Sequence, residues 1–198
     1  MNEADVDLLT SDGQGNLTLT QDRNRGGTVT TGQMATGTYM VASNGRTTAS
    51  TGHGSGSGAV CYVVQQNEAF CIETSSSYPG ITFFEPQSGG PFSNASLSGE
   101  YLGGSLPQHV STNFDTVNSQ YYDGAGNFDE VYTKSGPGGT QQNLPTSGPY
   151  TVDSTGAITV SSNGSAIFHG YVVGPGKFEA ITTDNNPRVL FEVKSSAP

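Results

Sequence analysis

The chain contains one pattern twice, and this repeat constrains the fold more than any other feature. The turn sequence Asp12-Gly-Gln-Gly-Asn16 returns as Asp123-Gly-Ala-Gly-Asn127, 111 positions later. Further along, Tyr62-Val-Val64 returns as Tyr171-Val-Val173, 109 positions later. An offset that shrinks in small steps indicates two copies of one fold separated by short loop deletions.

The two copies are unequal at their beginnings. The second opens with Leu97-Ser-Gly-Glu-Tyr101, for which the first has no counterpart. In a chain of 198 residues, the repeat predicts a first domain over 1–88 and a second over 89–198. We therefore expect the first domain to lack its opening strand.

Both copies read as strings of β-hairpins. No segment keeps a helical apolar stripe, whereas short alternating runs end at glycine-rich turns among the 28 glycines. Expected strands in the first copy cover about 4–11, 16–22, 36–42, 46–51, 58–65, 69–74 and 80–85. Those in the second cover about 98–106, 114–122, 127–134, 147–153, 157–162, 165–173, 177–183 and 188–194.

Consecutive antiparallel strands with one apolar face close most simply into an up-and-down barrel of about eight strands. We therefore predict an all-β protein of two tandem meander barrels, with a β-sandwich as the alternative. The expected inward side chains of the first copy are Leu17, Leu19, Tyr39, Val41, Val60, Tyr62, Val64, Phe70, Ile72 and Phe84. Those of the second are Tyr101, Phe128, Tyr150, Val152, Ile158, Val160, Tyr171, Val173, Phe178 and Phe191.

Cys61 and Cys71 are the only cysteines. They lie on the two arms of one expected hairpin, and pairing Tyr62 with Phe70 on the core face places the cysteines opposite each other on the other face. Such a cross-strand pair favours a disulfide over two free thiols, and a disulfide is typical of an oxidising compartment.

The segment Gln87-Ser-Gly-Gly-Pro-Phe-Ser-Asn-Ala-Ser-Leu-Ser-Gly-Glu-Tyr101, together with the Asp-Gly-x-Gly-Asn turns, resembles a family of secreted bacterial repeat proteins. These tandem β-rich modules are abundant in Acidobacteria. The resemblance implies secretion and tandem arrangement, and it supplies no catalytic residues.

Charge and hydropathy exclude several partners. A formal net charge of −10 with only seven basic residues argues against nucleic acid and against an anionic membrane surface. No apolar run is long enough to span a bilayer, so we expect no membrane insertion. The first residues do not resemble a signal peptide, so we expect an extracellular or cell-surface protein whose signal lies outside this sequence.

Candidate chemistry is sparse. The Asp12 and Asp123 turns lack the further acidic residues of a calcium loop and read as structural turns. His53, His109 and His169 have no metal-binding spacing, although His169 is placed to point into the second barrel. We therefore expect no enzyme, cofactor or metal. A last set of residues is expected as outward, solubilising charge: Glu73, Glu85, Asp129, Glu130, Glu179 and Glu192.

The missing strand suggests a function. A barrel one strand short exposes backbone N–H and C=O groups that a strand from another copy or a neighbouring module could pair. We expect a non-enzymatic structural or adhesive module, a surface or filament component, whose assembly edge comprises Asp5, Val6, Asp7, Leu8 and Leu9. The alternative is a lipocalin-like or carbohydrate-binding module, in which Tyr121, Tyr122 and Tyr132 face a polysaccharide.

Overall fold

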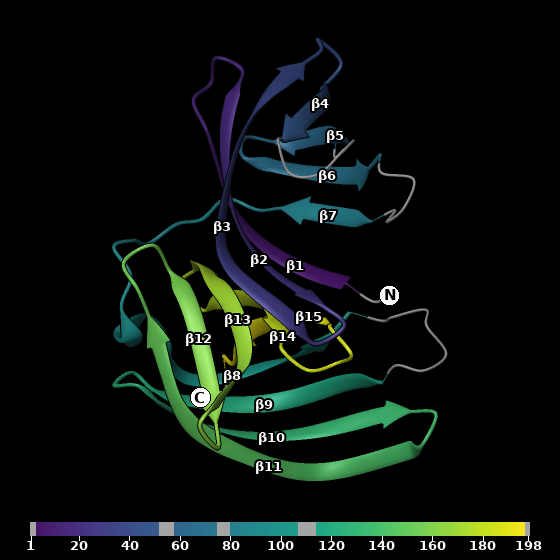
Figure 1. Cartoon of the computed structure of the whole chain (residues 1–198). Helices are drawn as coiled ribbons and strands as arrows, with labels where there is room; N and C mark the ends of the chain where they lie inside the picture. Colours follow the sequence, from purple (N-terminus) through teal and green to yellow (C-terminus); the bar gives the residue numbers. More distant parts are fainter. Residues whose placement is uncertain (1–2, 52–57, 75–79, 107–113, 197–198) are drawn as a thin grey trace. The chain divides into compact units, whose positions relative to one another are not determined.

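The computed structural model describes residues 3–51, 58–74, 80–106 and 114–196. Within these residues the regular elements are β-strands, apart from the short 3-10 helix η1 (Asn94–Ser96). The strands form two sheets (Figure 1), one for each repeat. No helix in this part of the chain is long and apolar enough to cross a bilayer.

The first sheet, called the open sheet below, contains seven strands in chain order. They are β1 (Glu3–Ser11), β2 (Asn16–Arg25), β3 (Thr28–Val41), β4 (Arg46–Thr51), β5 (Gly58–Gln65), β6 (Glu68–Glu73) and β7 (Ile81–Phe84). Because β1 and β7 lie at opposite ends of this order, the sheet does not close.

The second sheet is a closed barrel. It closes because β8 pairs with β15 on one side and with β9 on the other. Its strands are β8 (Ser98–Ser105), β9 (Asp115–Asp123), β10 (Asn127–Gly136), β11 (Gly139–Val152), β12 (Ala157–Ser162), β13 (Ser165–Gly174), β14 (Lys177–Thr182) and β15 (Val189–Lys194). Two tandem barrels, the first lacking a strand, are thus confirmed, and the sandwich alternative is wrong.

The chain divides into two compact units, neither of which is continuous along the sequence. One unit contains Met1–Val6, Asp22–Thr31 and Ser88–Pro198, and the other contains Asp7–Gln21 and Gly32–Gln87. The ends of β1, β2 and β3 therefore group with the closed barrel. These parts of β1, β2 and β3 belong to the open sheet by hydrogen bonding and to the unit of the closed barrel by their contacts.

The paired aspartate turns are structural, as the sequence predicts. In the second repeat, one carboxylate oxygen of Asp123 accepts hydrogen bonds from the backbone N–H groups of Ala125, Gly126 and Asn127 at 2.7, 2.9 and 2.9 Å. The other oxygen accepts from the Asn127 side chain at 2.7 Å. These bonds, led by the one from the Asn127 side chain, lower the pKa of Asp123 to about 2.

Aromatic side chains fill the closed barrel. The rings of Tyr101, Tyr150 and Phe178 surround that of Tyr122, with centroids 5.0 to 5.7 Å away and mostly edge-to-face. Phe128 lies on the same ring at 6.0 Å. All five side chains are almost completely buried, so this part of the interior holds a packed core.

The predicted facing is wrong for β13 and β15. Phe168 and Val172 belong to the buried barrel core, so His169, Tyr171 and Val173 point outward, because side chains alternate along a strand. On β15 the inward residues are Leu190 and Glu192, and Phe191 faces out. Both faces of β13 carry apolar residues, and on β15 the outward face is the more apolar one, so alternation alone could not select the inner face.

The disulfide between Cys61 and Cys71 is present, but on the opposite face from the one expected. Cys61 on β5 is the register partner of Cys71 on β6. Their counterparts in the closed barrel, Gly170 and Ala180, are also register partners and lie on the inner face. The sulfurs therefore lie on the inner face of the open sheet. Tyr62, with its partner Phe70, belongs to the outer face.

Candidate functional site

The gap in the open sheet is the principal candidate site. In the closed barrel, β8 occupies the place between β15 and β9. Their counterparts in the open sheet are β7 and β1, and each has a single neighbouring strand in the described part of the chain. Both therefore present an outer row of backbone N–H and C=O groups, the arrangement that accepts an added strand.

The five residues expected at the assembly edge all lie on β1, the terminal strand. Val6 is buried, Asp5, Asp7 and Leu8 are half-buried, and Leu9 is exposed. Asp5 forms an ion pair with Arg23 at 3.2 Å. These residues thus lie on a terminal strand of the open sheet, and the beginning of that strand, up to Val6, belongs to the unit of the closed barrel.

The inner face of the open sheet is only partly covered. Val41 and Val63 are 49 % and 43 % exposed, whereas the equivalent Val152 and Val172 of the closed barrel are 8 % and 1 % exposed. The open sheet therefore leaves on its inner face apolar area that the closed barrel buries.

A second candidate site is a buried polar cluster inside the closed barrel. Asn118 donates hydrogen bonds to Glu130 and to Glu192, each at 2.9 Å. Gln120 also donates to Glu130 at 3.0 Å and accepts from the Tyr122 hydroxyl at 2.7 Å. The two carboxyl groups were expected to face outward, and this expectation is wrong.

Burial changes the ionisation of this cluster. It raises the pKa of Glu192 to about 8, opposed by the hydrogen bond from Asn118. Burial also raises the pKa of Glu130 and holds that of Tyr122 well above its ordinary value. Glu192 is completely buried, so it is mostly protonated at neutral pH.

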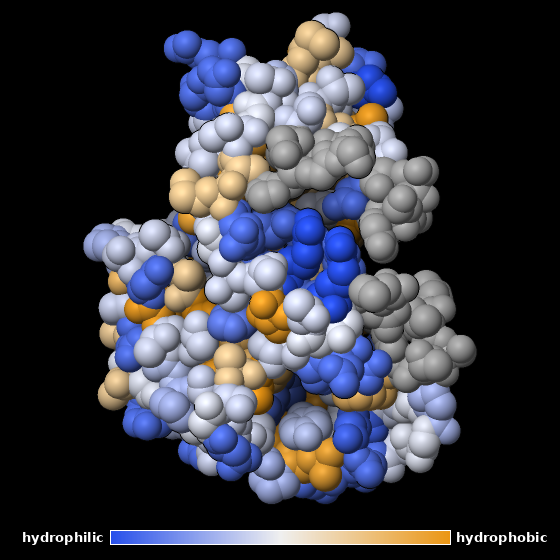
Figure 2. Space-filling view, viewed as in Figure 1, coloured by the Kyte–Doolittle hydropathy of each residue, from blue (hydrophilic) through white to orange (hydrophobic). Residues whose placement is uncertain are grey.

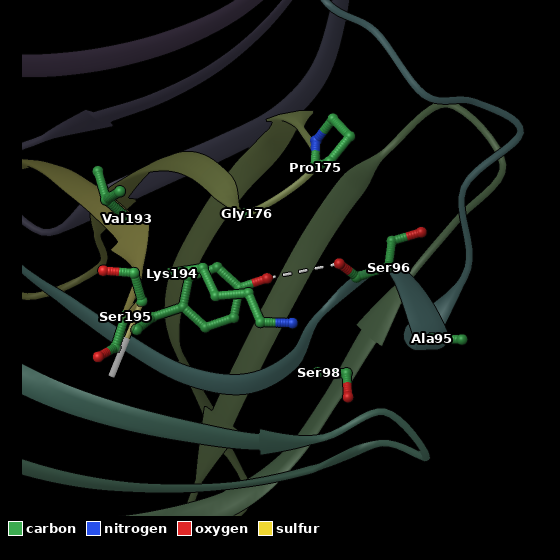
Figure 3. Close-up of a pocket in the computed structure, with 10 residues that line it drawn as sticks. Ala95, Ser96, Ser98, Pro175, Gly176, Val193, Lys194 and Ser195 are labelled. Carbon is green, nitrogen blue, oxygen red and sulfur yellow. Dashed lines mark hydrogen bonds between the residues drawn. The ribbon is translucent and has the colours of Figure 1, made fainter. Parts of the chain in front are cut away.

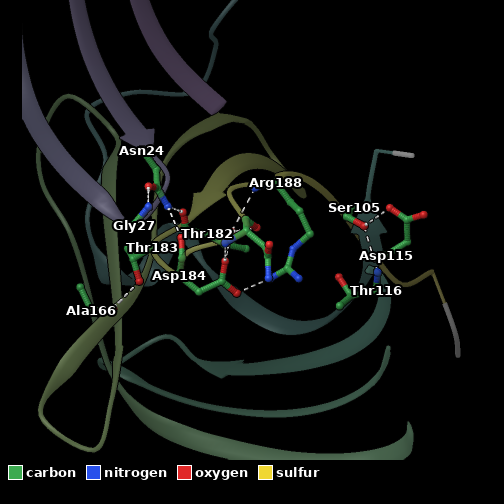
Figure 4. A network of polar contacts seen from close by, with 11 residues as sticks. Asn24, Gly27, Ser105, Asp115, Thr116, Ala166, Thr182, Thr183, Asp184 and Arg188 are labelled. Carbon is green, nitrogen blue, oxygen red and sulfur yellow. Dashed lines mark hydrogen bonds and ion pairs between the residues drawn. The ribbon is translucent and has the colours of Figure 1, made fainter. Parts of the chain in front are cut away.

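Arg188 is a further buried polar residue that the sequence does not predict. It is 5 % exposed and forms an ion pair with Asp184 at 2.8 Å, while its guanidinium carbon lies 4.1 Å from the centre of the Phe114 ring. Figure 4 shows Arg188 within a network that includes Asp184 and Thr182. Burial lowers the pKa of Arg188, and the charge of Asp184 opposes this.

The two carboxyl groups of the interior cluster are almost completely buried: Glu130 is 5 % and Glu192 is 0 % exposed. Two carboxyl groups can share acid and base roles only if a substrate reaches them. Among the described residues, no three His, Cys, Asp or Glu side chains are grouped to hold a metal ion.

The tyrosines proposed to face a glycan do not form a platform. Tyr121 is exposed, but Tyr122 is completely buried in the barrel, which corrects its expected outward position. Tyr132 is half-buried, and its register partner Asn118 places it on the inner face. His53 and His109 lie outside the described residues.

A pocket opens near η1, at the edge of β8 and β15 (Figure 3). It is lined by Ala95, Ser96, Ser98, Tyr101, Pro175, Gly176, Val193, Lys194, Ser195 and Ser196. Small and hydroxyl side chains dominate this lining, and Lys194 contributes its single amine. These groups give no arrangement that selects one ligand chemistry.

The molecular surface adds no further site on the side shown in Figure 2. Hydrophilic and intermediate side chains predominate there, and the hydrophobic ones form small separate groups.

No family model matches the chain, and a search of curated proteins finds no match either. Its function must be argued from the sheets themselves.

The sequence contains one weak indication that Glu130 is buried. Phe128, Glu130 and Tyr132 alternate on one strand, so an inward Phe128 implies an inward Glu130. Carboxylates generally prefer the surface, and this preference led to the expectation of an outward Glu130. Nothing comparable in the sequence indicates the position of Arg188, because it precedes β15 in a loop.

Proposed function

We propose that this protein is a non-enzymatic extracellular structural module that assembles by β-strand complementation. The gap between β7 and β1 accepts a strand, donated by another copy of the chain or by a neighbouring module. The observation that carries this proposal is the double pairing of β8 in the closed barrel, compared with the single neighbours of β1 and β7.

The energetics favour such an acceptor. An added strand would form a ladder of backbone hydrogen bonds with two terminal strands, β7 and β1. Its inward side chains would also cover the inner face on which Val41 and Val63 are exposed. Burying apolar area contributes about 25 cal/mol for each Å² removed from water.

Two features support a location outside the cytoplasm. The Cys61–Cys71 disulfide is typical of oxidising compartments. The net charge of −10 keeps a secreted protein soluble. The resemblance to secreted tandem modules points in the same direction and supports a structural or adhesive role at the cell surface.

A peptide with the sequence from Leu97 to Ser105, which contains β8 and is called the β8 peptide below, tests the proposal. We expect it to bind the full-length protein and to slow amide hydrogen exchange along β1 and β7. At a peptide concentration of 100 times the Kd, the unfolding free energy should rise by about 2.7 kcal/mol if only the folded state binds.

The control is the same peptide with Tyr101→Ser. Tyr101 points into the closed barrel and is almost fully buried, so this change removes the main inward side chain while keeping every backbone group. It should bind more weakly. Full protection of the β1 and β7 amides without peptide, or no protection at saturating peptide, would contradict strand complementation.

A further inference from the structure

The outside of the closed barrel is covered at one place. Ile181 points outward, because it follows the inward Ala180, yet it is 0 % exposed. Its outward neighbour Tyr171 is 6 % exposed. On the outside of a barrel such burial requires another layer of protein.

The ends of β1 and β2 supply that layer. The side-chain nitrogen of Asn24 donates to the backbone oxygens of Thr182 and Asp184 at 2.6 and 2.8 Å (Figure 4). Asp22 lies close enough to His169 for its charge to affect the ring. All of these residues belong to one compact unit.

The covering side chains share one face of β1 and β2. Ala4 and Val6 alternate with Asp5 on β1, while Asp22 and Asn24 alternate with Arg23 on β2. Asp5 and Arg23 pair with each other on the opposite face. The covering face is therefore the outer face of the open sheet, at the ends of its first strands.

The open sheet has the same outer face, but uncovered. Register joins Val60, Ile72 and Ile81 in one row, and Tyr62, Phe70 and Phe83 in the next. Ile72 and Ile81, the counterparts of Ile181 and Val189, are 53 % and 73 % exposed. We call these six residues the acceptor face.

The acceptor face is a continuous apolar surface. Tyr62 is 56 % exposed, and the rings of Phe70 and Phe83 contact each other edge-to-face with centroids 5.1 Å apart. Contiguous exposed apolar surfaces of this kind mark interaction sites in soluble proteins. In the second repeat the counterparts of Tyr62 and Ile72, which are Tyr171 and Ile181, are both buried.

The closed barrel in turn has an unused covering face. Val117 of β9 is the counterpart of Val6 at the repeat offset, and it is 63 % exposed where Val6 is 7 % exposed. Val131 of β10 faces the same side, since its partner Ser119 alternates with Val117. We call Val117, Val131 and Thr133 the donor face.

We propose that the donor face of one copy docks on the acceptor face of a second copy. Each contact repeats between two chains the packing that β1 and β2 make on the outer face of the closed barrel within one chain. Because donor and acceptor are different surfaces, the contact is head-to-tail, and further copies add to it as a closed ring or as an open chain.

This contact goes beyond strand complementation and uses other residues. The acceptor face is the outer surface of β5 to β7, whereas the proposed strand would pair at the sheet edges and cover the inner surface. Two chains that each carry a charge of −10 repel each other. Association through apolar faces should therefore strengthen with added salt, which screens that repulsion.

Single charge insertions separate the two faces. Ile72→Glu blocks the acceptor face and Val117→Glu blocks the donor face, and both positions are exposed in the single chain. We expect the wild type to form species larger than dimers in sedimentation velocity. Each variant alone should associate at least about tenfold more weakly.

An equimolar mixture of the two variants is the decisive sample. Each variant retains the face that the other has lost, so the mixture should form 1:1 dimers and nothing larger. Met34→Glu, at an exposed position on neither face, serves as the control and should behave as the wild type. Repeating the series with saturating β8 peptide keeps the two proposals apart, because the peptide fills only the gap.

Several results would overturn the docking proposal. One is a wild type that stays monomeric at its highest soluble concentration and at high salt. Others are variants that associate as the wild type does, or a mixture that stays monomeric. Association that the β8 peptide abolishes would favour the strand gap as the only contact and would equally overturn docking of the two faces.

Discussion

The side-chain amide of Asn118 donates hydrogen bonds to two buried carboxyl groups, those of Glu130 and Glu192, at 2.9 Å each. The three side chains come from β9, β10 and β15. β9 and β10 are consecutive strands, whereas Glu192 on β15 lies 74 positions after Asn118. This single amide therefore links strands on both sides of β8, where the barrel closes.

Replacing Asn118 should destabilise the closed barrel. Asn118→Ala leaves both carboxyl groups without this donor, and a buried acceptor without a partner costs about 1–3 kcal/mol. Urea unfolding monitored by tyrosine fluorescence would measure the loss. Asn16→Ala, at the exposed turn of the first repeat, removes an amide of the same size outside the barrel. A loss no larger than that of this control would contradict the role of Asn118.

The stability of the protein should fall as pH rises from about 4.5 to about 8. The pKa of Glu192 is raised from 4.5 to about 8, so between these values the folded state holds a proton that the unfolded chain releases. The free energy of unfolding then decreases with pH by at most about 1.4 kcal/mol per unit. Glu192→Gln keeps a neutral side chain at all pH values and should flatten this dependence.

Glu100→Gln is the matched control for that series, because it removes the same charge from an exposed position on β8. Melting temperatures between pH 4.5 and 8 would give the slope for each protein. An equal slope in the wild type and in Glu192→Gln would show that Glu192 does not take up the proton.

Gly170→Ala should destabilise the closed barrel by about 1–3 kcal/mol. A Cβ at this position would meet the backbone oxygen of Glu179 and lie 2.8 Å from the Cβ of Ala180. The barrel wall cannot yield without shifting β14. Gly138→Ala is the control, because a Cβ there meets nothing within 4 Å, and its melting temperature should match the wild type.

Removing the disulfide should weaken the open sheet selectively. Cys61 and Cys71 are separated by 10 positions, and opening a loop of this size costs about 2–3 kcal/mol in the chain-entropy account. In the Cys61→Ala, Cys71→Ala variant, hydrogen exchange should accelerate in β5 and β6. Equal acceleration in β13 and β14 would show that the disulfide stabilises the whole chain.

The strand order followed directly from the sequence. The glycine turns after Asp12 and Asp123 fixed the hairpins, and the predicted strands over 46–51, 58–65 and 157–162 match β4, β5 and β12. The length of β3 (Thr28–Val41) was missed. Its first half is a polar run of threonine and glycine without the alternation that marks a strand.

The facing of the hairpins was harder to predict than their existence. In Tyr171-Val-Val173 both faces carry large apolar residues, and a shift of one residue exchanges them. The outer face of this strand is itself buried at Tyr171, which is 6 % exposed. Alternation along a strand cannot separate a core from a second apolar surface, which is why the sequence predicts Tyr62 and Phe70 on the inner face.

The neutral state of Glu192 has a calorimetric consequence. Near pH 7 the chain must take up close to one proton from the buffer as it folds, since the carboxyl group is ionised in the unfolded chain and protonated inside the barrel. The heat of unfolding should therefore change with the ionisation enthalpy of the buffer. When the heat of unfolding is plotted against the ionisation enthalpy of the buffer, the slope gives the number of protons released on unfolding.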